Sequence, residues 1–454
     1  MMERTKLTKR VWFNLILFGF MGQLAWNVEN MYFNTFLYNY IGGTPNDINA
    51  MVAASAVTAV LTTFVMGALS DRLGRRKPLI SIGYILWGVT VTAFAFISRE
   101  NVMKILPSLG AAGVAAVTVT LVIVMDCMMT FMGSTCNDAA FNAWLTDSTD
   151  ETNRGSVESV NSMLPLAATL LVTVGFGAGV TALGYPACFI GLGALVVVSG
   201  VVGLFTLKEP ANLEPTKGGY FKNLVYGFRP SVVKENKRLY VLLAAQCIAG
   251  VAQQVVMPYL FIYIQHCLNF DFNNAISVLT GKPLLLAALV AGLILFVLAV
   301  IAFGRLTDKL GRDPFLIPAV VLEIAGFAIA YPMKTIFSFA LGLAVYGLGM
   351  LMFGIIISAA VRDNTPPDRV GAFQGVRMIF FVLLPMVIGP WIGARVIEHY
   401  SRLHELGMYV NDYGETVAKP VPEIFLYAAI VSVLLIVPAL ILRKWRMKRQ
   451  NDTN

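Results

Sequence analysis

The sequence predicts an all-α integral membrane protein in which twelve transmembrane helices form two six-helix halves. The first observation is composition, because 57% of the 454 residues are hydrophobic and only 13% are charged. Soluble domains contain roughly 45–50% apolar and about 25% charged residues. The second observation is arrangement: apolar stretches of about 20 residues, enough to cross a hydrocarbon core of about 30 Å, recur along the chain. The third is a pair of motifs that occurs once in each half.

Twelve apolar stretches supply the predicted helices. The fourth is the hardest to bound, because the apolar run from Leu109 to Leu145 exceeds one bilayer crossing. Gly110 and Gly113 in that run fit either a turn or a tilted extension of the helix. The predicted spans are residues 11–38, 49–70, 78–97, 116–145, 156–181, 186–207, 239–267, 283–304, 314–332, 336–361, 371–396 and 423–442.

Basic residues predict the orientation of these spans. The chain has 34 Lys and Arg residues, and most of them lie at the two termini and in the loops from even to odd spans. Loops rich in Lys and Arg stay on the cytoplasmic side of a membrane. We therefore expect a multi-pass protein of the plasma membrane with both termini in the cytoplasm.

The region between the sixth and seventh spans has the composition of a linker. It contains Pro210, Pro215 and Pro230, with Lys and Arg throughout. The expected domains are an N-terminal six-helix bundle at 1–207, a cytoplasmic linker at 208–238 and a C-terminal six-helix bundle with a cytoplasmic tail at 239–454.

Two loop motifs recur in the same order in both halves. Residues 67–76, GALSDRLGRR, lie between spans 2 and 3, and residues 304–312, GRLTDKLGR, lie between spans 8 and 9. After spans 4 and 10, Asp147 and Asp363 begin runs in which Thr, Gly and Val follow at the same spacing. Parallel repeats of six helices, related by an axis along the membrane normal, are typical of one transporter architecture. The sequence thus indicates an internal duplication.

The first motif resembles the hallmark loop of the major facilitator superfamily, G-x-L-x-D-R-x-G-R-R. The segment AFNAWLTDST at 140–149, followed by NRG at 153–155, resembles the glycoside–pentoside–hexuronide:cation symporters, such as melibiose carriers and sucrose/proton symporters. The resemblance implies a secondary transporter that moves a sugar or glycoside by alternating access. Melibiose-type members carry acids on the second helix where this chain has Ala59 and Thr63, so we expect a proton as the coupling ion. An efflux carrier for a drug or polar metabolite is the alternative.

The repeated loops also predict a conformational latch. Glycines let helices approach closely, aspartate accepts hydrogen bonds at a helix N-terminus, and arginines can reach carboxylates across a half. The alternative is a basic loop that only sets topology. The predicted latch residues are Gly67, Asp71, Arg72, Gly74, Arg75, Asp308, Gly311, Arg312, Arg154 and Arg369.

Polar residues inside the spans predict the solute site. Such residues are costly in a bilayer and usually face the bundle interior or a water-filled cavity. In this fold spans 1, 4, 7 and 10 are expected to line the cavity, and one face of span 1 carries polar residues at i, i+3, i+4 and i+7. Amides and an indole suit a sugar, although amides also join helices to one another. The predicted solute ligands are Gln23, Trp26, Asn27, Asn30, Asp126, Asn137, Gln253 and Gln254.

Intramembrane carboxyl groups are the candidates for proton coupling, because burial disfavours the charged form of such a group. The candidates are Glu29, Asp126 and Asp138, and the alternative for each is a structural role. Glu323 lies in span 9, which is expected at the periphery, so we interpret it as structural.

The remaining features exclude other classes of function. The net charge of +8 is spread over short loops and forms no stripe for nucleic acid. The five cysteines have no metal-ligand spacing. No nucleophile motif or phosphate-binding loop supports an enzyme. We expect a monomer in the bilayer, with no cofactor and no metal, whose partners are a sugar and H⁺.

Overall fold

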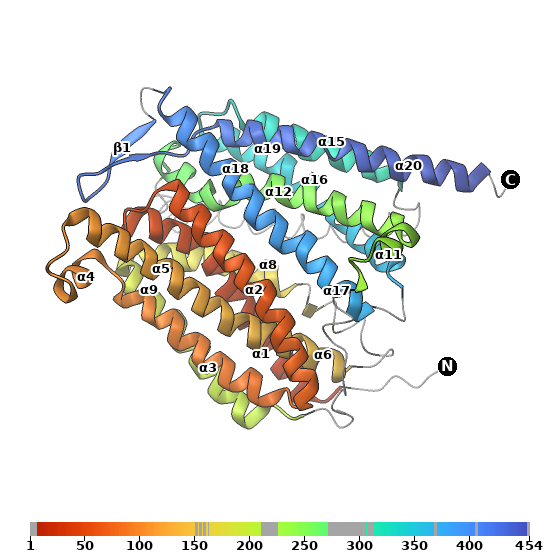
Figure 1. Cartoon of the computed structure of the whole chain (residues 1–454), viewed down its shortest axis with the longest axis horizontal. Coiled ribbons are helices and arrows are strands. Elements are labelled where there is room, and N and C mark those ends of the chain that lie inside the picture. The colour runs from red at the N-terminus through yellow and green to blue at the C-terminus, as the bar shows by residue number, and fades with distance from the viewer. Residues whose placement is uncertain are drawn as a thin grey trace, which may run out of the picture. The chain divides into compact units, whose positions relative to one another are not determined.

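The computed structural model describes residues 7–149, 153, 157, 160–161, 163–209, 226–270, 303, 306, 313–366, 370–404 and 407–451 (Figure 1). The chain divides into two compact units, which we call the N-terminal unit, Met1–Tyr220, and the C-terminal unit, Phe221–Asn454. Within the described residues, nine helices are long and apolar enough to cross a membrane, and Pro314–Ala330 is a shorter apolar helix.

The N-terminal unit is built from helices alone in its described part, and several of them contain π-helical turns, labelled η. Its elements are α1 (Lys9–Val28), η1 (Glu29–Phe33), η2 (Phe36–Tyr40), α2 (Pro45–Leu73), α3 (Lys77–Ala93), the 3-10 helix η3 (Phe94–Phe96), α4 (Arg99–Ile105), α5 (Ala111–Gly133), η4 (Ser134–Phe141), α6 (Asn142–Asp147), α8 (Leu164–Leu171), η5 (Val172–Phe176) and α9 (Gly177–Thr206).

The C-terminal unit adds one small hairpin to its helices. Its elements are α11 (Pro230–Glu235), α12 (Lys237–His266), α15 (Asp313–Ala330), α16 (Ile336–Asn364), α17 (Val370–Met378), η7 (Ile379–Leu383), α18 (Leu384–Ser401), β1 (Met408–Val410), β2 (Thr416–Ala418), α19 (Glu423–Val433) and α20 (Ile436–Asn451). The hairpin, in which Tyr409 pairs with Val417, was not predicted from the sequence.

The predicted gap between the fifth and sixth spans is confirmed. Helix α9 is broken at Gly184, whose φ of 80° and ψ of 164° lie outside the helical region. A positive φ costs glycine nothing, and Pro186 then fits the start of the second part of α9. The fourth span resolves as one long stretch, Ala111–Asp147, so its apolar run is a helical extension that begins after Gly110. Of the predicted eighth span, only Phe303 belongs to the described residues.

Close packing of small residues holds the N-terminal unit together. Helices α3 and α9 run side by side (Figure 1). A Cβ atom on Gly200 would lie 2.7 Å from the carbonyl oxygen of Ser81, and one on Gly193 would lie 2.6 Å from that of Gly88. Glycines on one helix therefore let the other approach at backbone distance, as is usual where helices pack inside a bilayer.

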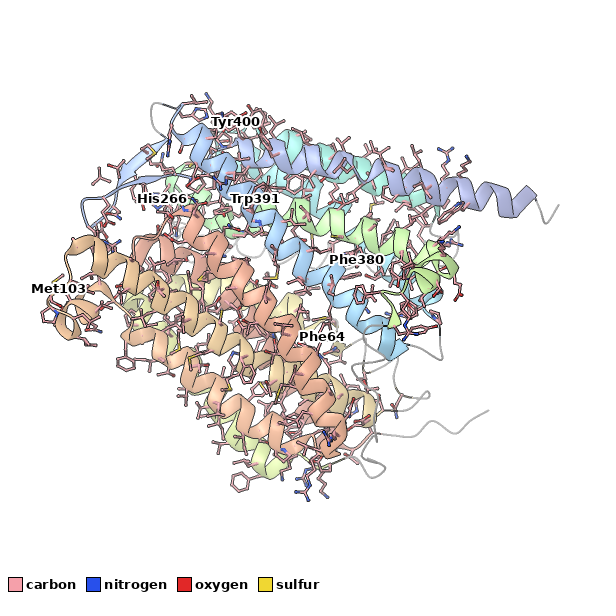
Figure 2. All side chains as sticks on the ribbon, viewed as in Figure 1. Phe64, Met103, His266, Phe380, Trp391 and Tyr400 are labelled. Carbon is pink, nitrogen blue, oxygen red and sulfur yellow. The ribbon has the colours of Figure 1, made fainter. Side chains whose placement is uncertain are left out.

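The outer surface of the unit is apolar. Ile82, Leu86 and Val89 follow one face of α3, and all three are exposed. Met103 projects from α4 and is also exposed (Figure 2). A stripe of this kind is typical of a helix that faces lipid, because water would disfavour it.

Candidate functional site

A buried cluster of polar side chains joins three helices of the N-terminal unit. Oε1 of Glu29, in η1, accepts hydrogen bonds from the hydroxyls of Ser55 on α2 at 2.9 Å and Thr130 on α5 at 3.1 Å. The two hydroxyls lie 2.8 Å apart. Glu29 is only 8% exposed, so this carboxyl group is held by hydroxyls in a site that largely excludes solvent.

Asp126 lies one helical turn before Thr130 and is 2% exposed. The Ser55 hydroxyl lies against its carboxyl group as well, and the carboxyl groups of Glu29 and Asp126 interact electrostatically. Oδ1 of Asp126 and Oε2 of Glu29 are buried without a hydrogen-bond partner. Among the described residues neither carboxyl group has an ion pair. Two buried carboxyl groups without a counter-cation are costly when both are ionised, so the arrangement is suited to holding a proton.

Asp138, the third candidate for proton coupling, lies in η4 and is half-buried. Its Oδ2 accepts a hydrogen bond from Ser134 at 2.9 Å, and its charge acts on Glu29. The structure therefore gathers all three carboxyl groups named from the sequence in one region of the N-terminal unit. π-helical turns often mark functional sites, and Glu29 and Asp138 both lie in such turns.

The amides of span 1 mostly satisfy their hydrogen bonds locally. Nδ2 of Asn27 donates to the carbonyl oxygen of Gln23 at 2.8 Å, and its Oδ1 accepts from Thr169 at 2.8 Å. Nδ2 of Asn30 donates to the carbonyl oxygen of Trp26 at 2.8 Å, and Asn30 is exposed. Asn27 would therefore have to exchange one of these partners to bind a solute, whereas the exposed Asn30 has only its Nδ2 engaged by the backbone of its own helix.

Trp26 is the polar aromatic residue of this row. Its ring packs on Trp87 with centroids 5.1 Å apart and planes at 49°. Its Nε1 is buried without a hydrogen-bond partner, although a buried indole N–H usually has one. An unsatisfied donor at this place is consistent with either a solute or a water molecule as its partner.

Asn137 has a different environment from the rest of the predicted solute ligands. It is 5% exposed, and its Nδ2 donates to Oη of Tyr84 at 2.6 Å. The Tyr84 hydroxyl in turn donates to the carbonyl oxygen of Phe18 at 2.7 Å. The chain of bonds links η4, α3 and α1, which favours the helix-joining alternative for Asn137.

The two glutamines of the seventh span belong to the C-terminal unit. Gln253 and Gln254 are half-buried in the middle of α12. A Cβ atom on Gly389 of α18 would lie 2.5 Å from Cβ of Gln254, so these helices are in close contact at that level. Oε1 of Gln246, two turns earlier, is buried without a partner.

The loop predicted to act as a latch in the N-terminal unit holds an ion-pair network centred on Arg76, which is not among the predicted latch residues. Nη2 of Arg76 lies 2.6 Å from Oδ1 of Asp71, and its Nε lies 3.1 Å from Oδ2 of Asp147. Its Nη1 donates to Oγ of Ser70 at 2.6 Å. Arg76 is 5% exposed, so the side chain is enclosed by its partners.

Of the other predicted latch residues, the structure describes Arg72, Arg75, Gly67 and Gly74. Arg72 and Arg75, which were selected, are exposed. Gly67 is half-buried on α2, and Gly74 ends that helix with φ of 58°. Asp308, Gly311, Arg312, Arg154 and Arg369 lie outside the described residues. The sequence contains one signal for the role of Asp147, because this residue matches Asp363 after the corresponding span of the second half. That match could have indicated Asp147 as a partner of an arginine in the loop.

A carboxylate also fixes the start of α3. Oε2 and Oε1 of Glu209 accept hydrogen bonds from the backbone N–H groups of Arg76 and Lys77, each at 2.9 Å. An anion is favoured at a helix N-terminus, where free N–H groups and the helix dipole point. The segment that follows α9 is thereby tied to the loop that carries Arg76.

Comparison with known proteins agrees with this architecture. The family model of the Major Facilitator Superfamily matches residues 15–302 and 281–454. The inner membrane transport protein YajR of Escherichia coli (strain K12) is 31% identical over 108 residues, which are 23% of this chain and 22% of that protein. The match thus spans about a fifth of the length of this curated relative.

Two solved structures resemble the chain over nearly its whole length. One is a bacterial homologue of the human lysosomal transporter Spinster, inward-facing and unoccupied, with a TM-score of 0.68, 11% identity and coverage of 96% of this chain and 97% of that one. The other is the nucleoside transporter NupG, with a TM-score of 0.66, 16% identity and coverage of 96% and 99%. At these identities the likeness shows the fold, and it confirms the predicted all-helical membrane architecture. The chain is a multi-pass membrane transporter that works by alternating access, not an enzyme, and it belongs to the Major Facilitator Superfamily.

Proposed function

We propose that this transporter moves a sugar or glycoside by proton-coupled symport. The observation that carries the coupling is the buried pair of carboxyl groups, Glu29 and Asp126, which share the Ser55 hydroxyl and have no counter-cation among the described residues. Burial without a cation favours a site that binds a proton and releases it when the surroundings change.

Hydroxyl groups supply the contacts that a proton site needs. A hydroxyl both donates and accepts, so Ser55 and Thr130 can satisfy Glu29 whether it is neutral or ionised. A sodium ion would require several oxygen ligands around one point. Glu29 and Asp126 leave one unpartnered oxygen each, and a proton on either carboxyl group would give that group a donor of its own.

The chemistry of the proposed solute rests on two separate groups of residues, the polar row of span 1 in the N-terminal unit and the half-buried amides of α12 in the C-terminal unit. Asn27, Asn30, Gln253 and Gln254 offer both donors and acceptors, which polyhydroxylated solutes require. The Trp26 ring packs on Trp87, but the residue is only half-buried and its indole N–H has no partner, so its remaining surface can stack on a sugar ring. A subfamily related to the glycoside–pentoside–hexuronide symporters remains part of this proposal.

The proposed topology places both termini in the cytoplasm and the protein in the plasma membrane, with bundles at 1–207 and 239–454 joined by a cytoplasmic linker at 208–238. In this arrangement the network around Arg76 lies at the cytoplasmic end of the N-terminal unit. It would act there as the conformational latch.

Uptake into proteoliposomes tests the coupling. A thermal-shift screen against mono- and disaccharides first identifies a solute that binds. We then expect an inward proton gradient to drive its accumulation by the wild-type protein, and Glu29→Gln and Asp126→Asn to abolish accumulation while exchange of labelled for unlabelled solute continues. Glu100→Gln is the matched control, because Glu100 is exposed and pairs with Lys104 on the surface of α4. Accumulation driven by a sodium gradient at equal pH would contradict the proposal.

A further inference from the structure

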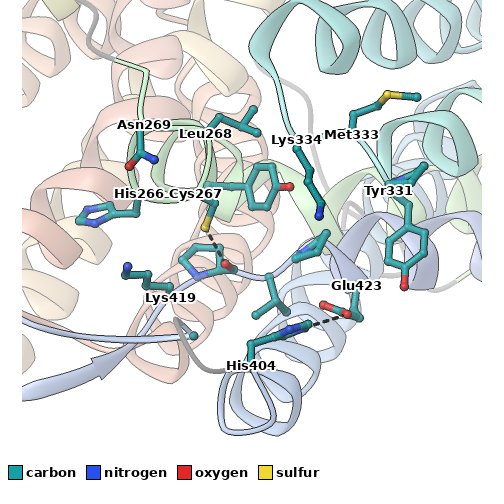
Figure 3. Close-up of a pocket in the computed structure, with 16 residues that line it drawn as sticks. His266, Cys267, Leu268, Asn269, Tyr331, Met333, Lys334, His404, Lys419 and Glu423 are labelled. Atoms are coloured by element: carbon teal, nitrogen blue, oxygen red, sulfur yellow. Dashed lines mark hydrogen bonds and ion pairs between the residues drawn. The ribbon is translucent and has the colours of Figure 1, made fainter.

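The C-terminal unit contains a cavity of about 730 Å³ whose lining includes none of the predicted solute ligands or proton-coupling residues (Figure 3). Its walls come from the end of α12, the loop between α15 and α16, and the segment between α18 and α19. A volume of this size is within the range of small-molecule sites. We propose that this cavity binds a small organic anion that carries hydroxyl groups, as a site additional to that of the transported solute.

The charges of the cavity select an anion. Lys334 and Lys419 both line it, and neither has an ion pair in the described part of the chain. Figure 3 shows Lys334 extending from its loop into the cavity, with Lys419 beside His266 on another wall. Glu423 is the one carboxylate among the lining residues. The balance of charge on the walls is therefore positive, which attracts an anion.

The carboxylate of Glu423 explains why the ligand should also carry hydrogen-bond donors. Oε1 of Glu423 lies 2.9 Å from Nε2 of His404. Its Oε2 is buried without a partner, and the residue as a whole is 6% exposed. A buried acceptor without a donor is costly, and a hydroxyl group of a bound ligand would satisfy it.

The walls are held in place by contacts that do not involve a ligand. Sγ of Cys267 contacts the carbonyl oxygen of Pro420 at 2.9 Å, and the backbone N–H of Lys419 donates to the carbonyl oxygen of Gly407 at 2.8 Å. The segment that carries Lys419 is thus tied both to the end of α12 and to the residue that precedes the β-hairpin. A site built in this way needs little ordering when the ligand binds.

Calorimetric titration of the purified full-length protein tests the proposal with three probes. Glucuronate carries both an anionic group and hydroxyls, glucose carries hydroxyls alone, and hexanoate carries an anionic group alone. We expect saturable binding of glucuronate that weakens with rising salt. Glucose and hexanoate should bind at least about tenfold more weakly, because each lacks one of the two required groups.

Variants of the two lining lysines test whether glucuronate binds in this cavity. Lys334→Gln and Lys419→Gln should each weaken glucuronate binding about tenfold. Lys444→Gln, which removes an exposed lysine from α20, should leave it unchanged. Lys334 is exposed, so its variant should fold normally, which thermal unfolding checks.

The proposal is overturned if glucuronate does not bind, if glucose or hexanoate binds as tightly, or if Lys444→Gln weakens binding as much as the two cavity variants. Uptake of a neutral sugar should be unaffected by Lys334→Gln, so this site and the proposed transport function can fail independently.

Discussion

Nε of Arg76 lies 3.1 Å from Oδ2 of Asp147, so one ion pair joins the loop after α2 to the end of α6. The same guanidinium lies 2.6 Å from Asp71. A planar guanidinium can serve two carboxylates in fixed directions, whereas an ammonium is a point charge. The network therefore depends on Arg76 in particular and not on the basic character of the loop.

Replacement of Arg76 should disturb conformational exchange more than solute binding. We expect Arg76→Lys to lower the transport rate severalfold while the affinity for solute changes little, because a latch shifts an equilibrium between states. Destabilisation should be about 1–3 kcal/mol, less than for a fully buried pair, because the Asp71 and Asp147 side chains are 37% and 31% exposed. Arg72→Lys and Arg75→Lys are the controls, since both side chains are exposed. An equal loss of transport in the controls would contradict a special role for Arg76.

Removal of the Ser55 hydroxyl should weaken proton coupling. Ser55 contacts Glu29, Thr130 and Asp126, so Ser55→Ala leaves a buried carboxyl group with one donor fewer, at a cost of about 1–3 kcal/mol. We expect the pH at which uptake is half-maximal to shift, while solute exchange at equal pH persists. Thr63→Ala on the same helix is the control, because the Thr63 hydroxyl donates to the backbone of its own helix at 2.8 Å. An unchanged pH profile in Ser55→Ala would remove Ser55 from the coupling site.

The helix-joining role of Asn137 can be separated from solute binding by a double-mutant cycle. We expect Asn137→Ala and Tyr84→Phe each to lower the thermal stability, and the double variant to lose less than the sum, since the two side chains share a bond of 2.6 Å. Each single loss should be about 1 kcal/mol or more. Thermal unfolding in detergent gives the stability, and titration gives the affinity. A large loss of solute affinity in Asn137→Ala without a loss in Tyr84→Phe would instead make Asn137 a solute ligand.

Close packing of α3 and α9 predicts opposite effects for two glycines on the same helix. Gly200→Ala should destabilise the protein by about 1–3 kcal/mol, because its Cβ would lie 2.7 Å from backbone atoms of α3 that cannot move alone. Gly191→Ala should be neutral or stabilising by up to about 1 kcal/mol, because nothing lies within 4 Å of its Cβ and alanine favours a helix. Thermal unfolding of both variants decides the matter. Equal destabilisation would show that helix packing does not limit either position.

Hydrophobic patterning was sufficient for the coarse architecture. Apolar length located most of the spans, and the interval left between residues 181 and 186 contains Gly184, at which the structure breaks α9. The hairpin at 408–418 escaped prediction because its strands have only three residues each, which is too short for a period of two to stand out.

The contacts of the site were harder to predict. Glu29 and Asp126 were each selected for being acidic inside a span, but their shared partner Ser55 lies on a third helix, and only packing brings the three together. The sequence does not distinguish Arg76 from Arg72 and Arg75, because all three are arginines of one motif. Only the end of α2 at Gly74 determines that Arg76 points towards Asp71 and Asp147. The π-helical turns leave no mark in composition, since the same residues can form either kind of helix.

The π-helical turn at Glu29–Phe33 makes the first span sensitive to its length. A π turn accommodates one residue more than an α turn. Deleting one residue there would restore a regular α-helix whose two sides keep their faces, whereas deleting one residue of α1 before Trp26 would rotate everything on one side of the deletion by about 100° relative to the other. Trp26 and Asn27 would then leave the face they now share with their partners on α3 and α8. A one-residue deletion within the turn should therefore impair transport less than a one-residue deletion within α1, even though every remaining side chain is unchanged in both variants.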